Sequence, residues 1–209
     1  MRILLLSIAA MFYLSVPVPT CAQNLELVAI YEADQAVRSD PAKIDWTLLV
    51  PEDRRRRERV LDILRAGAVK TAADYHRAAM VFQHGESLDD IRLAHALSTI
   101  AMSLAPDEKQ YRWLTAASWD RIMTTQLQPQ WYGTQFQSDD KGIFLYPVEE
   151  DAVNDDERRA MQVPTLTEAR AQLQEMGRMH GQAINPAPPT IEQLRKARQE
   201  AVQEKEGNE

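Results

Sequence analysis

Apolar side chains recur at helical spacing through most of the chain that follows the first 22 residues. Segment 88–105 shows the pattern most plainly, because its large apolar residues lie three or four positions apart, at Leu93, Leu97, Ile100 and Leu104. The same periodicity, read with start and stop residues, predicts helices over 25–39, 51–66, 72–84, 88–105, 108–126 and 166–180. We therefore expect an all-α fold, an antiparallel array of about five to six helices that pack partly as tetratricopeptide-like hairpins.

Local start signals mark the beginnings of several predicted helices. The stretches "TAAD" (71–74), "SLDD" (87–90) and "TLTE" (165–168) each place a hydroxyl three residues before a carboxylate, which is the spacing of a capping box. Pro51 is followed by two acidic residues, a pattern typical of a first helical turn, and it predicts that the second helix begins there. Pro106 cannot continue a helix, so it predicts the end of the fourth.

The helical pattern breaks after Leu127, and proline and glycine residues punctuate the stretch that runs to about Pro164. Within this stretch, "GIFLYPV" has the β-branched and aromatic composition of a short extended segment. A connection of this length inside a compact domain is often functional. We expect one helical domain over 23–183, followed over 184–209 by a proline-bearing linker and a charged C-terminal tail.

The N-terminus has the three parts of a secretory signal peptide: a positive start, an apolar run over 3–14, and small residues before position 23. Cleavage after Ala22 removes 1–22, leaves Gln23 as the first residue, and discards Cys21, the only cysteine. Lipidation of Cys21 is the less favoured alternative, because "VPT" matches a lipoprotein site poorly. The sequence thus predicts an exported protein, periplasmic or secreted, without a transmembrane helix in the mature chain.

The charge balance argues against a nucleic-acid partner. The net charge is -7 and the sequence pI is about 5.2, whereas phosphate binding needs clustered Lys and Arg. The basic run Arg54–Arg57 looks at first sight like a patch that binds nucleic acid. Because Glu52 and Asp53 precede Arg56 and Arg57 by four residues, we interpret the run as a solvated helix face with ion pairs.

His84, His95 and Asp120 are the candidates for catalytic chemistry. The short turn around position 85 has the potential to bring the two imidazoles together, and Asp120 is a possible third member. The chain has no His-x-x-x-His pair and no pair of cysteines, so we expect neither a metal site nor a cofactor. An enzyme of the small hydrolase or transferase type would have to rest on these three side chains.

Charged residues also continue two otherwise apolar helix stripes. Asp120 follows Trp113 and Ala117 on one stripe, and Asp34 and Arg38 continue another. A buried charge must be paired or hydrogen-bonded, and Arg38 is one possible partner for Asp120. Two interpretations stay open: a buried ion-pair network that orients helices, and a polar pocket with shifted pKa values.

Five ordered motifs resemble those of an uncharacterised bacterial family that is catalogued only as a domain of unknown function: "DQAVR" (34–38), "FQHG" (82–85), "RWLTAASWDR" (112–121), "PQWYGTQ" (129–135) and "DDERRAMQV" (155–163). The resemblance covers about residues 27–170 and names no activity. It implies one shared set of polar positions, namely Asp34, Gln35, Gln83, His84, Asp120, Arg121, Gln130, Tyr132, Thr134 and Gln135. With Arg38, these are our candidate ligand-binding residues.

The stretch "QPQWYGTQF" (128–136) combines aromatic rings, amides and Gly133, which permits a backbone turn. Tyr132 can cover apolar surface, while Gln130 and Gln135 offer both donors and acceptors. Such a corner suits recognition of an amide-rich ligand, and it suits equally the capping of unpaired backbone groups. The favoured hypothesis is a binding module with a polar pocket for a peptide, a protein or a small polar ligand; the alternative is the enzyme built on His84, His95 and Asp120.

Overall fold

The computed structural model describes residues 22–40 and 43–206. These parts of the chain form eight helices and one β-hairpin, in the order α1 (Leu25–Ala36), α2 (Trp46–Arg65), α3 (Ala72–Gln83), α4 (Leu88–Leu104), α5 (Lys109–Thr125), β1 (Phe136–Asp139), β2 (Gly142–Leu145), α6 (Asp155–Ala160), α7 (Leu166–His180) and α8 (Ile191–Glu206). The fold is mostly helical, as the sequence predicts. It is not purely all-α, and the helices outnumber the five to six expected.

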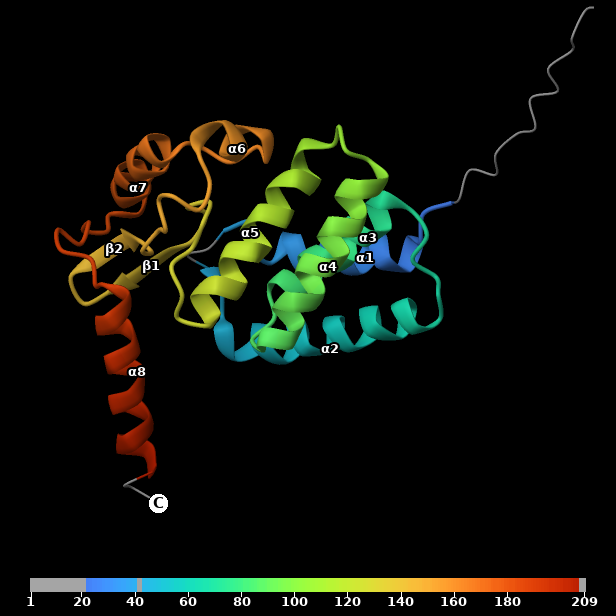
Figure 1. Cartoon of the computed structure of the whole chain (residues 1–209). Coiled ribbons are helices and arrows are strands. Elements are labelled where there is room, and N and C mark those ends of the chain that lie inside the picture. Colours follow the sequence, from blue (N-terminus) through green and yellow to red (C-terminus); the bar gives the residue numbers. More distant parts are fainter. Residues whose placement is uncertain (1–21, 41–42, 207–209) are drawn as a thin grey trace, which may run out of the picture.

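Helices α3, α4 and α5 pack side by side at the centre of the molecule, and α1 and α2 flank them (Figure 1). The buried faces of these three helices carry several alanines, which allow the backbones to approach closely. Larger apolar residues fill the space toward α1 and α2 and form the main core: Leu27, Val60, Ile63, Val69, Val81, Phe82, Leu97 and Leu114.

The predicted capping boxes form at Thr71, Ser87 and Thr165. In each, the hydroxyl accepts the backbone N–H of the acidic residue three positions later, and that carboxylate accepts the N–H of the capping residue. Helices α3, α4 and α7 accordingly begin and end within about two residues of their predicted bounds, and so does α5, which has no side-chain cap.

The prediction that the second helix begins at Pro51 is wrong. Helix α2 begins at Trp46, because the Asp45 side chain caps it by accepting the backbone N–H of Thr47 at 2.9 Å. Pro51 lies inside the helix, where its missing N–H leaves one backbone hydrogen bond unmade. The end of the first helix is also corrected, since α1 stops at Ala36 and not at residue 39.

The second part of the molecule is built on the β-hairpin, with α6 and α7 beyond it (Figure 1). The "GIFLYPV" segment supplies β2, which pairs antiparallel with β1 in the register Phe136 with Leu145. The chain after α7 then docks on β2, because Ile143 donates its N–H to the Ala183 carbonyl at 2.8 Å and accepts the N–H of Asn185 at 2.9 Å. The predicted tail therefore starts with an ordered contact.

Helix α8 projects away from the helical body in Figure 1. Its first turns are held by the buried Ile191 and by Arg195, which donates to the Leu127 carbonyl at 3.0 Å. Residues 196–204 of this charged helix are exposed.

The predicted signal peptide, including Cys21, lies outside the described residues except for Ala22. Within the described ranges, no helix combines the length and the apolar character that a membrane span requires.

Candidate functional site

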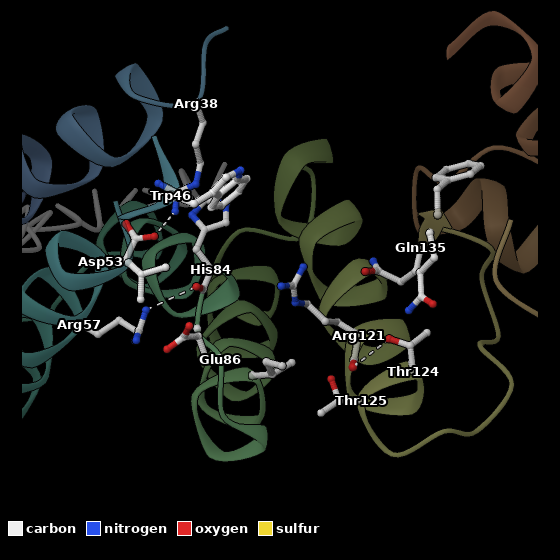
Figure 2. Close-up of a pocket in the computed structure, with 15 residues that line it drawn as sticks. Arg38, Trp46, Asp53, Arg57, His84, Glu86, Arg121, Thr124, Thr125 and Gln135 are labelled. Atoms are coloured by element: carbon white, nitrogen blue, oxygen red, sulfur yellow. Dashed lines mark hydrogen bonds and ion pairs between the residues drawn. The ribbon is translucent and has the colours of Figure 1, made fainter. Parts of the chain in front are cut away.

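A cavity of about 530 Å³ opens between α2, the turn from α3 to α4, the C-terminal half of α5, and the start of β1 (Figure 2). Its charged lining consists of three guanidinium groups and two carboxylates, from Arg38, Arg57, Arg121, Asp53 and Glu86. The remaining lining residues are Trp46, Val50, His84, Gly85, Ile91, Thr124, Thr125, Gln135, Phe136 and Gln137. The cavity is therefore polar with an aromatic edge.

The Asp34 carboxylate, which is only 1% exposed, organises one wall of this cavity. It accepts hydrogen bonds from Arg38 Nη1 at 2.9 Å and from Gln35 Nε2 at 2.8 Å, and its Oδ2 lies 2.9 Å from His84 Nδ1. Arg38 in turn donates to Asp53 on α2 (Figure 2). Asp34 thus fixes the positions of two lining side chains without itself lining the cavity.

The turn from α3 to α4 is held by Arg57. The Arg57 guanidinium lies 3.5 Å from Asp90 and donates to the His84 carbonyl at 3.4 Å. Gly85 lies directly against Asp90, because a Cβ added at Gly85 would come within 2.2 Å of the Asp90 Cβ. The next residue, Glu86, is exposed at the cavity, and its carboxylate has no hydrogen bond or ion pair within the described parts of the chain.

Arg121 is the half-buried cation of the opposite wall. Its side chain reaches from α5 toward the α3–α4 turn in Figure 2, and no dashed line meets its guanidinium. No carboxylate from residues 22–40 or 43–206 lies within ion-pair distance of it. Burial lowers the pKa of Arg121, and the positive charge of Arg38 lowers it further. The cavity therefore contains a partly desolvated positive charge that forms no ion pair with any described residue.

Asp120, the neighbour of Arg121, is fully buried and turns away to the loop after α5. One carboxylate oxygen accepts the backbone N–H groups of Trp131 at 2.8 Å and Tyr132 at 2.9 Å. The other oxygen accepts the N–H of Thr134 at 3.0 Å and its hydroxyl at 2.8 Å. Burial raises the pKa of Asp120, and these four donors oppose the rise. The proposed pairing of Arg38 with Asp120 is wrong, since each has other partners.

The stretch 128–136 folds around these contacts. Gly133 has φ +84°, a conformation that L side chains rarely adopt. The Gln130 side chain is fully buried, and its Nε2 donates to the carbonyls of Gln135 at 2.9 Å and Tyr146 at 2.8 Å. Its Oε1 accepts the Gln135 N–H at 2.8 Å. This amide therefore closes the loop onto the β-hairpin, and the loop carries Gln135 to the edge of the cavity.

The three catalytic candidates do not come together. His84 bonds Asp34 and lines the cavity. His95 faces α5, where its Nδ1 lies 3.2 Å from the Thr115 carbonyl and 3.1 Å from the Ser118 hydroxyl. Burial lowers the pKa of His95. Because Asp120 is occupied by the loop, no hydrogen bond joins any two of the three candidates.

The predicted ligand-binding residues divide into three groups. Those that line the cavity are Arg38, His84, Arg121 and Gln135. Two others, Asp34 and Gln35, do not line the cavity but hold its lining residues in place: Asp34 bonds Arg38 and His84, and Gln35 bonds Asp34. Those that are not among the lining residues are Gln83, Asp120, Gln130, Tyr132 and Thr134. The backbone N–H groups of the corner "QPQWYGTQF" therefore serve mainly to fold this loop, because they donate to Asp120 and Gln130. Its contribution to the cavity consists of Gln135 and Phe136.

Four residues that line the cavity are not among those predicted from the sequence: Trp46, Asp53, Arg57 and Glu86. The interpretation of Arg54–Arg57 as a solvated face is wrong for Arg57, which is only 7% exposed. A signal for this was present: Asp53 and Arg57 precede the buried Val60 by seven and three residues, so they extend its apolar stripe by two turns. Glu86 has no comparable pattern in the sequence.

Across the described ranges, no group of three or more His, Cys, Asp or Glu side chains is arranged to hold a metal ion. Comparisons of the chain with protein-family models, with curated proteins and with solved structures give no match. The resemblance to a family of unknown function stays a prediction, and the function has to be argued from the cavity.

Proposed function

We propose that the protein is an exported binding module that holds a polar ligand, such as part of a peptide or protein partner, in the cavity around Arg121. The observation that carries this proposal is the half-buried Arg121 guanidinium, whose charge has no ion-pair or hydrogen-bond partner among the described residues. An unpaired charge in a partly desolvated site is unfavourable in the free protein, and a ligand that supplies the missing partner relieves that cost.

The fixed positions of the surrounding side chains support the same proposal. Arg38 and His84 are both bonded to the buried Asp34, and Arg57 is held by Asp90. Side chains that are immobilised before a ligand arrives lose little conformational entropy on binding. The enzyme alternative is not favoured, because His84, His95 and Asp120 have separate partners and only His84 reaches the cavity.

Replacement of Arg121 tests the proposal. A thermal-shift screen of the purified protein against polar metabolites and peptides should give compounds that raise the melting temperature, since ligands of the folded state stabilise it. We expect Arg121→Gln to abolish these shifts without lowering the free energy of unfolding by more than about 0.5 kcal/mol, because the guanidinium has no hydrogen bond or ion pair within the described residues and its charge is unfavourable in the free protein.

Arg38→Gln is the matched comparison. It removes the bonds to Asp34 and Asp53, so it should lower the free energy of unfolding by about 2 kcal/mol. A screen without any compound whose shift depends on Arg121 would contradict the proposed function.

Export has its own test. The signal-peptide pattern predicts that the protein recovered from the cell envelope begins at Gln23, which intact-mass measurement detects directly. A diacylglyceryl mass on Cys21 would show lipoprotein processing, and a mass that includes Met1 would contradict cleavage.

A further inference from the structure

Two opposite charges without partners face the same cavity. Arg121 on α5 is the cation, and Glu86 after the α3–α4 turn is the anion. Neither has a hydrogen bond or ion pair from its charged group in the described ranges, and the two are too far apart to pair with each other. A ligand that satisfies both must carry one negative and one positive group.

The other charges of the cavity are already neutralised within the protein. Arg38 is paired with Asp34 and Asp53, and Arg57 with Asp90. Because these guanidinium groups have their own carboxylates, Arg121 is left to bind an anion almost alone. A single guanidinium with carboxylates nearby favours a monoanion such as a carboxylate over a phosphate dianion, which both Asp53 and Glu86 would repel.

The rest of the lining agrees with a ligand that is small and partly apolar. The cavity volume of about 530 Å³ lies within the range of roughly 300–1,000 Å³ that small-molecule sites occupy. Trp46 lines the same cavity with its side chain 61% exposed, so its ring offers a flat surface to a ligand, including a positively charged group.

We propose that the cavity binds a zwitterion, an amino acid or short peptide with free termini, whose carboxylate contacts Arg121 and whose ammonium group contacts Glu86. This inference rests on the proposed function, because it names the chemistry of the ligand that the same cavity takes. Thr124, Thr125 and Gln135 line the same cavity and offer hydroxyl groups and an amide oxygen to the polar backbone of such a ligand, since Gln135 Nε2 already donates to the Ala117 carbonyl and the Thr134 hydroxyl.

Isothermal titration calorimetry of the purified protein with four tripeptide mixtures tests the proposal. The mixtures contain all natural side chains at each position and are unblocked, C-terminally amidated, N-terminally acetylated, or blocked at both ends. We expect the unblocked mixture to bind and each single block to weaken binding by at least about tenfold, the size of one charge-assisted hydrogen bond. Free amino acids and inorganic phosphate are titrated in parallel.

Variants then assign each terminus to its residue. Arg121→Gln should lose sensitivity to amidation but keep sensitivity to acetylation, and Glu86→Gln should show the reverse pattern. Arg198→Gln on α8 and Glu32→Gln on α1 are matched controls at exposed positions outside the cavity, and they should bind as the unchanged protein does.

Three results would contradict the proposal that the cavity binds a zwitterion. One is equal binding of unblocked and doubly blocked peptides, the second is binding of phosphate that requires Arg121, and the third is no binding of any peptide or amino acid. In all three cases, an Arg121-dependent compound from the thermal-shift screen would leave the proposed binding function standing. The absence of such a compound as well would remove both.

Discussion

Replacing Asp120 by alanine is expected to lower the free energy of unfolding by about 3–5 kcal/mol, because three backbone N–H groups and one hydroxyl lose their acceptor. The carboxylate is fully buried between α5 and the loop that follows it. Alanine offers these groups no acceptor, so the donors of Trp131, Tyr132 and Thr134 lose their buried partner. Urea denaturation at neutral pH measures the loss.

A graded set of variants separates hydrogen bonding from other effects of the change. Asp120→Asn keeps one carbonyl oxygen and should cost about half as much as alanine. Thr134→Val removes the two hydrogen bonds of the Thr134 hydroxyl, to Asp120 and from Gln135 Nε2, and should cost about 1–2 kcal/mol. Asp140→Ala, in the exposed hairpin turn, is the control and should be neutral within about 0.5 kcal/mol. A neutral Asp120→Ala would show that the loop does not depend on this carboxylate.

The helix starts and strand β1 show which parts of the fold can be predicted from sequence. Helices with a local start signal were predicted well, because a capping box such as Ser87 with Asp90 lies within four residues of sequence. The start of α2 was missed because its N-cap, Asp45, has no acidic residue three positions later to complete a capping box, while Pro51 imitates a first turn. The strand β1 was missed because its sequence, "FQSD", has no strand pattern and is specified by pairing with β2.

The candidate site was predictable only where a charge interrupted an apolar stripe. That rule found Asp34 and Arg38, and it placed Asp120 correctly in the interior. It could not give partners, because Asp120 meets a loop more than ten residues away and His84 meets Asp34 across 50 positions of sequence. The cavity itself arises where α2, the α3–α4 turn, α5 and the start of β1 come together in the tertiary structure, so Glu86 and Trp46 had no signal of their own.

His76 makes the stability of the protein depend on pH in the acid range. It lies on α3 at 7% exposure, with its ring 4.6 Å from that of Tyr111 and 6.4 Å from that of Tyr31. Its Nδ1 has no hydrogen-bond partner. Burial, and to a smaller extent the charge of Arg77, lowers the pKa of His76 from 6.5 to about 4. The folded protein therefore holds this ring in the neutral form.

The sign of the pH dependence follows from which state binds the proton. Between about pH 6.5 and pH 4 the unfolded chain protonates His76 and the folded protein does not, so acidification favours unfolding. The contribution of His76 is fully present above pH 6.5 and is lost progressively toward pH 4, with a total loss of about 3 kcal/mol. The lowered pKa of His95 acts in the same direction.

His76→Phe is the variant that isolates this effect, because phenylalanine keeps an aromatic ring against Tyr111 and Tyr31 but binds no proton. Urea denaturation curves of both proteins, taken in steps between about pH 4 and pH 6.5, should diverge as the pH falls, with the variant losing less stability. The variant keeps two other groups with shifted pKa values: the lowered pKa of His95 gives a residual slope of the same sign, and the raised pKa of Asp120, which favours the folded state on acidification, opposes it in both proteins alike. Asp74 contributes only at lower pH, since its pKa is lowered from 3.8 and its stabilisation is lost below the tested range. Parallel curves for the two proteins would mean that His76 takes up its proton equally well in the folded state, and therefore that the α3 core admits water at this ring.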